Sequence, residues 1–319
     1  MKRTEAILAL REAQLKAGHL VSTRRTYRGW LVRYMAAIQN RSAHDLQSYL
    51  HLLAAGPDRV SPKSVKQALN ALVFFEKQVL HRDPGRLDIP AVSRHRNQPT
   101  WLTHAESLAI IERLSGLRRL QAEFLYGTGS RINAMLTLRL KDIDLATGLV
   151  NFRFDKGGKS RTVRIPQTIL DSLADHIRRV THLWQDDHRD GIIAPSPEPS
   201  LMKKLGRSTF GTLPWYWLFP SNRVRNGERW HATEDHLARA VRAAASSAGI
   251  TKRVTLHTFR HSNATALLQR GVDLRSIQEH LGHTHLSTTE IYTHATGARA
   301  LPTPLDCPPP SIIPFPVAV

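Results

Sequence analysis

The last third of the chain carries side chains that can bind a phosphate and attack it. His257, Arg260 and His261 stand close together, Leu281-Gly282-His283 follows, and Tyr292 comes after them. A guanidinium group holds phosphate oxygens through paired hydrogen bonds, and an imidazole can move protons. A tyrosine hydroxyl can act as the nucleophile. These residue types predict phosphoryl transfer without a metal or another cofactor, because no carboxylate cluster in the sequence suggests metal ligands.

Two upstream segments supply further cations. In Tyr126-Gly127-Thr128-Gly129-Ser130-Arg131, glycines precede Arg131 and let the backbone approach a ligand closely. The segment Asp155-Lys156-Gly157-Gly158-Lys159 has the composition of a turn. Either lysine of this turn could protonate a leaving oxygen. Spacing alone does not choose between Lys156 and Lys159.

Helices are expected to position most of these groups. His257 and Arg260 are three residues apart on a helix predicted to end at Gly271, so they share a face. Asp273 is expected to cap the next helix, which stops at Gly282 and leaves His283 just past its end. Ser287-Thr288-Thr289-Glu290 forms a capping box that places Tyr292 in the second turn of a short helix.

The same region contains other predicted elements. A capping box at Thr103-His104-Ala105-Glu106 opens a helix expected to end at Gly116. Residues 148–154 and 162–165 predict a β-hairpin, because they alternate in strand fashion around a glycine-rich turn. Residues 190–215 are rich in Pro, Ser and Gly and are expected to form a long loop. A helix over 233–248 is expected to stop at Gly249.

The N-terminal part, residues 1–88, is predicted to be helical. One helix opens near Ser22 and carries Arg24 and Arg25, which are candidate DNA contacts together with Lys63 and Lys66. Another helix covers His44 to Leu53, and a third follows Ser61-Pro62. Lys63 and Lys66 lie near the start of the third helix, where their charge opposes the helix dipole. A docked phosphate would relieve that conflict, but a solvated face is an equal alternative. Residues 89–100 are expected to be a basic linker, and residues 301–319 a Pro-rich tail.

Composition restricts the partners. The chain has 319 residues and a formal net charge of +19, from 45 Lys and Arg against 26 Asp and Glu. Such an excess spread along a globular chain favours a polyanion such as DNA. The single cysteine, Cys307, excludes an internal disulfide framework and a thiolate zinc cluster. No segment has the length of a membrane span, so we expect a cytoplasmic protein with no membrane partner.

In order and spacing, Arg131, Lys156, His257-x-x-Arg260, Leu281-Gly282-His283 and Tyr292 resemble the catalytic residues of the tyrosine site-specific recombinases, the phage-integrase family. The resemblance covers roughly residues 10–300. It implies a fold that is mainly α with a small β-sheet. A helical core-binding domain would span residues 1–88, and a mixed α/β catalytic domain would span residues 101–300.

The resemblance also implies a mechanism. Tyr292 would attack the scissile phosphate to form a 3′-phosphotyrosyl link, while Arg131 and Arg260 clamp the phosphate. His257 would assist proton movement, His283 would hydrogen-bond the phosphate, and Lys156 would protonate the leaving 5′-oxygen. Strand exchange in this family needs no ATP or other cofactor and takes place in a homotetramer on DNA.

A narrower resemblance points to the integron integrases, which integrate and excise gene cassettes. They have a similar aromatic insertion to the one expected here over residues 190–220, which contains Leu213-Pro214-Trp215-Tyr216-Trp217-Leu218-Phe219-Pro220. Their substrate includes a folded single strand with flipped-out bases. Trp215 and Trp217 could stack on such bases for about 1–3 kcal/mol each. Alternatively they anchor the insertion in the core. Lys159 and Arg161 are candidate DNA backbone contacts.

Two segments of the chain depart from the family pattern. Asn133-Ala134 stand where the family usually has Ser-Glu, and Asn263 replaces a usually buried aromatic residue. A buried amide costs stability unless it is paired. These departures motivate a first alternative, a catalytically impaired DNA-binding protein.

Two further alternatives remain open. The chain could be a Xer- or phage-type recombinase that acts on duplex sites. It could also be a metallohydrolase that uses a histidine group, namely His280, His283, His285 and His294.

Overall fold

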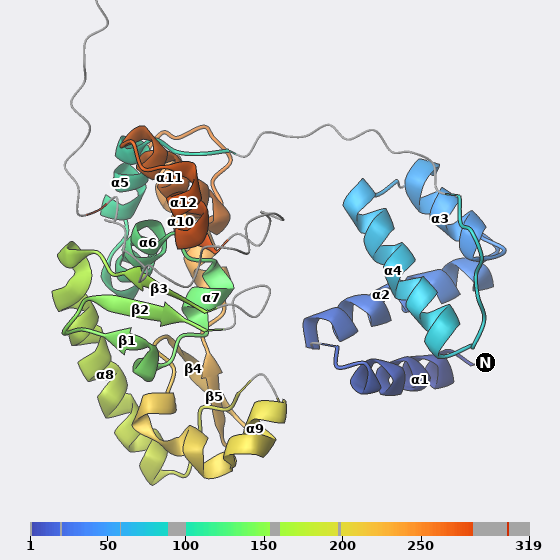
Figure 1. Ribbon diagram of the computed structural model, residues 1–319, viewed down its shortest axis with the longest axis horizontal. Coiled ribbons are helices and arrows are strands. Elements are labelled where there is room, and N and C mark those ends of the chain that lie inside the picture. The colour runs from blue at the N-terminus through green and yellow to red at the C-terminus, as the bar shows by residue number, and fades with distance from the viewer. Residues whose placement is uncertain are drawn as a thin grey trace, which may run out of the picture. The chain divides into compact units, whose positions relative to one another are not determined.

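The computed structural model describes residues 2–19, 21–57, 59–88, 100–153, 160–196, 199–282 and 305. It divides into two compact units, Met1–Asn97 and Gln98–Val319 (Figure 1). The first unit is helical, and the second combines helices with two small antiparallel sheets. The predicted fold class, mainly α with a small β-sheet, is therefore confirmed. No helix among the described residues is long and apolar enough to cross a membrane.

The N-terminal unit packs four helices around one core. They are α1 (Arg3–Lys16), α2 (Val21–Gln39), α3 (Leu46–Ala55) and α4 (Pro62–Gln78). Side chains set the helix starts, because Asp45 accepts a hydrogen bond from the Ser48 amide at 2.7 Å and Ser61 accepts one from the Ser64 amide at 3.2 Å. Helices α2, α3 and α4 each bury apolar side chains in this core, among them Leu31, Leu50, Leu72 and Phe75.

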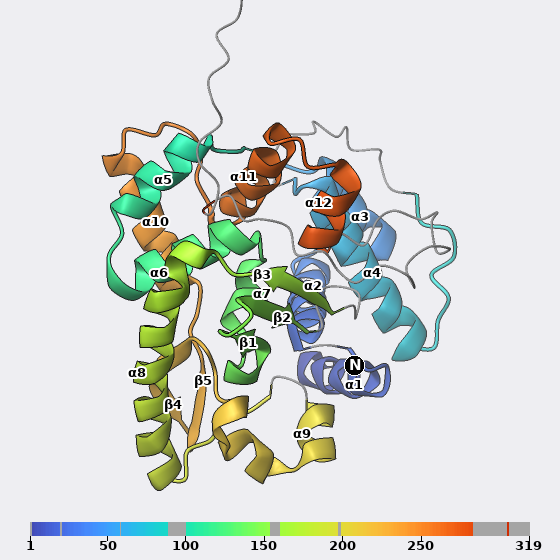
Figure 2. The same cartoon turned by 60° about the vertical axis from the view of Figure 1, so that its left-hand side comes forward.

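The C-terminal unit contains helices α5 to α12 and strands β1 to β5. The order is α5 (His104–Glu112), α6 (Gly116–Thr128), α7 (Ile132–Leu136), β1 (Ile143–Asp144), β2 (Leu149–Phe152), β3 (Arg161–Arg164), α8 (Leu170–Arg189), α9 (Pro199–Leu205), β4 (Pro220–Arg225), β5 (Glu228–His231), α10 (Asp235–Ser247), α11 (Leu256–Gln269) and α12 (Leu274–Leu281). Helices α5, α6, α11 and α12 gather at one end of this unit, and α9 with the β4–β5 hairpin lies at the other (Figure 2).

The predicted hairpin is confirmed as β2 and β3. The two strands pair antiparallel, with Val150 opposite Val163 and Phe152 opposite Arg161. Both valines are fully buried in the main core of the unit. The alternation in the sequence therefore has a physical cause, because one face of the hairpin packs against the core.

The helix that opens at Thr103 ends earlier than predicted. Its start is confirmed, since the Thr103 hydroxyl accepts a hydrogen bond from the Glu106 amide at 3.1 Å. The prediction that it runs to Gly116 is wrong. The Arg113 amide donates to the Ile110 carbonyl at 3.2 Å, which tightens the last turn and ends the helix. Gly116 instead begins α6.

The expectation of a long loop over residues 190–215 is also wrong. The segment contains α9 and two 3₁₀ turns, Arg207–Gly211 and Leu213–Trp215. A second hairpin, β4–β5, follows and was not predicted. Its turn residues Asn226 and Gly227 have φ angles of 53° and 68°. Positive φ at both positions is typical of the tight turns that match the strand twist, and Asn-Gly is the dipeptide that favours them.

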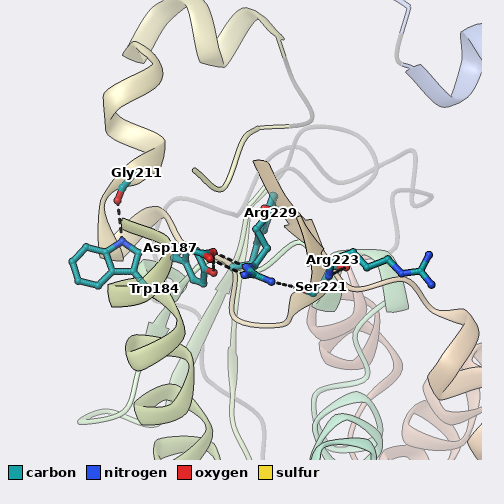
Figure 3. Close-up of polar contacts among 8 residues, drawn as sticks. Trp184, Asp187, Gly211, Ser221, Arg223 and Arg229 are labelled. Carbon is teal, nitrogen blue, oxygen red and sulfur yellow. Dashed lines mark hydrogen bonds and ion pairs between the residues drawn. The ribbon is translucent and has the colours of Figure 1, made fainter. Parts of the chain in front are cut away.

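A buried ion pair ties this second hairpin to α8 (Figure 3). Asp187 on α8 is 2% exposed and Arg229 on β5 is 7% exposed. Arg229 Nη2 donates to Asp187 Oδ1 at 2.6 Å, and its Nη1 donates to the Ser221 carbonyl at 2.9 Å. The Tyr216 hydroxyl also donates to Asp187. Trp184 adds a hydrogen bond to the Gly211 carbonyl at 2.9 Å, so the whole segment is fixed to one helix.

Removal of the Asp187 charge should destabilise the packing of the β4–β5 hairpin against α8. We expect Asp187→Asn to lower the free energy of unfolding by about 3 kcal/mol, because Arg229 would remain buried without its counter-charge. Urea denaturation measures the change. The neighbouring Asp186→Asn is the matched control, since Asp186 is exposed and forms an ion pair with the exposed Arg189. Equal effects of the two substitutions would contradict the prediction.

Candidate active site

Arg260 lies at the centre of the candidate site. It is on α11 and only 3% exposed. Its Nη1 donates to the Gly129 carbonyl at 2.7 Å and its Nη2 donates to the Leu281 carbonyl at 2.6 Å. Gly129 caps the end of α6, and Leu281 is the last residue of α12. One guanidinium thus joins the C-terminal ends of two helices to a third helix.

Two more arginines reach the same end of α12. Arg161 Nη1, from β3, donates to the Leu281 carbonyl at 2.8 Å. Arg131 Nη2 donates to the Gly282 carbonyl at 3.5 Å. The C-terminal end of a helix is the negative pole of its dipole, so cations are stabilised there. The carbonyls orient these guanidinium groups, so three cationic side chains gather beside one helix end.

His257 lies one turn before Arg260 on α11. It is exposed, and its ring centroid is 5.9 Å from that of His261. Partial burial, followed by the charges of His261, Arg260 and Arg131, lowers the pKa of His257. The imidazole is therefore neutral near pH 7, the state in which it can accept a proton.

The structure brings together Arg131, His257 and Arg260 from the predicted catalytic set. It adds Arg161, for which the sequence suggested only a contact with the DNA backbone. Lys156, Lys159, His283 and Tyr292 lie outside the described residues. His283 directly follows Gly282, whose φ of 64° ends α12 as expected. Asp273 caps the start of α12, also as expected, by accepting a hydrogen bond from the Ser276 amide at 2.9 Å.

The histidine group of the metallohydrolase alternative is only partly described. His280 is buried on α12, while His283, His285 and His294 lie outside the described residues. Within the described ranges, no three His, Cys, Asp or Glu side chains come close enough together to hold a metal ion.

The predicted DNA contacts of the N-terminal unit lie at two helix starts. Arg25, in the first part of α2, is exposed, and Arg24 beside it is half-buried. Lys63 and Lys66 are exposed in the first turns of α4, which begins with Pro62 as predicted. Their exposure is compatible with both phosphate contact and a solvated face.

Trp217 is an anchor of the insertion in this structure. It is 1% exposed, its indole nitrogen donates to the Arg229 carbonyl at 2.9 Å, and the Arg139 guanidinium lies 3.1 Å from its ring centroid. A fully buried indole cannot stack on a base, so the prediction that Trp217 binds DNA is corrected. Trp215 is half-buried, with the Lys141 ammonium group over its ring.

A basic pocket near the β4–β5 hairpin was not predicted. Its volume is 920 Å³, and its walls come from the start of α6, the hairpin and the start of α10. The lining includes one large aromatic residue and several cations, namely Trp230, Arg118, Arg223, Arg225 and Arg239. The Asn226-Gly227 turn is the sequence signal that would place Trp230, Arg223 and Arg225 on one hairpin.

Comparison with known proteins adds to this geometry. The phage integrase family matches residues 100–299, and the N-terminal SAM-like domain of phage integrases matches residues 8–86. An integrase/recombinase of Escherichia coli is 35% identical over 327 residues, which cover 97% of this chain and 96% of that protein. The tyrosine recombinase XerA of Pyrococcus furiosus is 33% identical over 283 residues, 88% of this chain and 85% of that protein.

The chain belongs to the phage integrase family. It is a tyrosine site-specific recombinase, an enzyme that cleaves and rejoins DNA. The expectations of the family and of the enzyme class are confirmed.

Solved structures share the fold of this recombinase. The Tn1549 transposon integrase in complex with circular intermediate DNA has a TM-score of 0.57 at 16% identity, over 88% of this chain and 92% of that one. XerH bound to its difH substrate has a TM-score of 0.55 at 20% identity, over 89% of this chain and 80% of that one. At these identities the likeness concerns the fold alone.

The buried His280 should make the recombinase sensitive to acid. Burial, followed by the charges of Arg161 and Arg260, lowers the pKa of His280 from 6.5 to about 4. The unfolded chain then binds this proton at a higher pH than the folded protein. Stability is full above pH 6.5 and is lost as the pH falls towards 4, by about 3 kcal/mol for this group.

We therefore expect His280→Leu to lessen the fall of the melting temperature between pH 7 and pH 4. Thermal melts in a pH series measure it, and the exposed His182→Gln serves as control. An unchanged pH dependence in His280→Leu would show that His280 is not the group responsible.

Proposed function

We propose that this tyrosine recombinase integrates and excises gene cassettes at integron recombination sites, acting as a homotetramer on DNA. The observation that carries the recombinase chemistry is the convergence of Arg131 and Arg260. Both donate to carbonyls at the C-terminal end of α12, immediately before His283. A phosphate bound at this helix end would meet two guanidinium groups that backbone carbonyls already hold in place, and preorganised charges of this kind stabilise charge in a transition state.

The remaining roles are those that membership of the family implies for the matching residues. Tyr292 attacks the phosphorus, the bond to the 5′-oxygen breaks, and the new phosphotyrosyl ester retains the 3′-side of the strand. Lys156 supplies the proton to the leaving 5′-oxygen, and His283 hydrogen-bonds a phosphate oxygen. His257, neutral because its pKa is lowered, takes up the proton at the nucleophile. The phosphotyrosyl ester conserves the bond energy, so rejoining needs no ATP.

Two features support the integron assignment. The first is the insertion between α8 and β4, which is held in place by the buried Asp187–Arg229 pair. The second is the basic pocket beside it. An unpaired base that leaves a folded single strand would find a phosphate-binding wall of arginines and the half-buried ring of Trp230 there. Stacking on an aromatic ring is tolerant of base identity and suits such a substrate.

A second candidate is a Xer-type recombinase that acts on duplex sites. The 33% identity to XerA of Pyrococcus furiosus over 88% of the chain favours it. A XerD of Staphylococcus saprophyticus is 29% identical over 84% of the chain. The two candidates share the chemistry and differ only in the DNA that they recognise.

Strand transfer should depend on Tyr292. With a nicked DNA that carries an integron-type site, we expect a protein–DNA adduct that survives denaturation. Tyr292→Phe should form none, since it lacks the attacking oxygen, while its affinity for the same DNA should stay within about threefold. Denaturing gels and a binding titration measure both quantities. Adducts in both proteins would assign the nucleophile to another residue.

The same assay separates the two candidates. An adduct on the folded single strand and little on the duplex would support the integron type. The reverse preference would support the Xer type. Tight binding with no adduct on either DNA would support a catalytically impaired DNA-binding protein.

Trp230 should decide the preference for folded single strands. We expect Trp230→Ala to weaken binding of a hairpin with extrahelical bases by about 1–3 kcal/mol and to leave duplex binding unchanged. Trp101→Ala is the control, because Trp101 is exposed but lies away from the pocket lining. An equal loss on both DNAs, or no loss on either, would exclude base stacking by Trp230.

A further inference from the structure

Asn263 lies on α11 three residues after Arg260, so both side chains leave the helix on the same side. Its exposed fraction is 0%. A buried amide costs free energy unless it is hydrogen-bonded. The hydrogen bonds of the Asn263 amide therefore show which parts of the structure it holds together.

The amide nitrogen of Asn263 holds the end of α6. It donates to the Tyr126 carbonyl at 2.8 Å and to the Gly127 carbonyl at 3.2 Å. These carbonyls belong to the last turn of α6, where a helix has no internal donors for them. Arg260, also on α11, donates a hydrogen bond to the Gly129 carbonyl at 2.7 Å. Two side chains of α11 thus satisfy three carbonyls at the end of α6.

The other half of the amide lies against the turn that follows α6. Gly129 has a φ of 58°, and a Cβ atom placed on it would be 2.6 Å from Asn263 Oδ1 and 2.8 Å from the Leu281 side chain. Within the described part of the chain, Oδ1 accepts no hydrogen bond. The turn is therefore fixed by close packing on one side and by hydrogen bonds on the other. Two residues later the chain reaches Arg131.

We propose that Asn263 is a positioning residue for the phosphate clamp of Arg131 and Arg260, an inference that rests on the proposed function of these two arginines. The Asn263 amide fixes the last turn of α6 to α11. Arg131 follows that turn and Arg260 lies on α11, so the amide holds the two guanidinium groups in one geometry. Asn263 therefore supports cleavage, although it departs from the aromatic residue that is usual at this position in the family.

The test removes the donors of Asn263 while keeping its shape. Asn263→Leu has similar volume and branching but cannot donate a hydrogen bond. Asn263→Phe restores the usual aromatic residue. Both are compared with the parent protein and with Arg131→Ala on nicked substrates of two kinds. One has an ordinary scissile phosphodiester, and the other has a methylphosphonate, whose neutral group does not need a cationic clamp. Melting curves and DNA-binding titrations accompany the cleavage rates.

We expect Asn263→Leu to cleave the phosphodiester about 10- to 100-fold more slowly, the loss typical of a misplaced catalytic group. The affinity for DNA should change by less than about threefold. Asn263→Phe should cleave the phosphodiester no faster than Asn263→Leu. On the methylphosphonate, the deficits of Asn263→Leu and Arg131→Ala should both largely disappear. General damage to the fold would instead slow both substrates equally.

Three outcomes would overturn the inference or its basis. Two outcomes would overturn the role of Asn263 but not the clamp, as long as Arg131→Ala cleaves the phosphodiester poorly. In the first, Asn263→Leu cleaves as fast as the parent protein. In the second, Asn263→Leu is slowed equally on both substrates. Full activity of Arg131→Ala on the phosphodiester would overturn the proposed clamp itself. If Asn263→Leu melts below the assay temperature, the smaller Asn263→Ala, which also lacks the amide donor, replaces it and must show the same pattern.

Discussion

The C-terminal unit depends on one helix end. The Leu281 carbonyl, at the end of α12, accepts hydrogen bonds from Arg260 on α11 and from Arg161 on β3. Arg260 in turn holds the Gly129 carbonyl at the end of α6. Three helices and the sheet therefore meet through charged donors at a site where the helix dipole favours positive charge. The arrangement stabilises the fold and gathers cationic side chains at one helix end.

A second polar network fixes the insertion, and it is separate from the first. Arg139, which follows α7, donates to the Ala194 and Pro195 carbonyls at 2.8 Å each, and it lies against the ring of Trp217. Burial lowers the pKa of Arg139 to about 9, although the nearby Asp142 opposes the shift. Such buried charges are retained only where hydrogen bonds compensate for the lost water. The insertion is thus a well-packed part of the C-terminal unit, with a small core of its own.

The two networks lie in different parts of the C-terminal unit. In the proposed function, the arginines at α12 hold a phosphate while a nucleophile attacks it. The basic pocket presents cations and Trp230 from other elements, namely the start of α6, the β4–β5 hairpin and the start of α10. Substrate choice can therefore vary while the cleavage chemistry stays the same.

The sequence alone determined the features that arise from local interactions. The caps at Thr103 and Asp273, the end of α12 at Gly282 and the β2–β3 pairing are set by residues a few positions apart, and the sequence predicted each of them. The family followed from the order of the catalytic residue types. The Asn226-Gly227 turn is also set by neighbouring residues, although the β4–β5 hairpin was not predicted.

Only the tertiary structure decided which side chains share one site. Trp217 and Trp230 are the same residue type, yet one is buried against Arg139 and the other lines a pocket. Arg161 reaches the Leu281 carbonyl across 120 positions of sequence, and Asn263 reaches Tyr126 across 137. No pattern of neighbouring residues encodes such contacts, because burial and hydrogen-bond partners depend on how distant elements pack together.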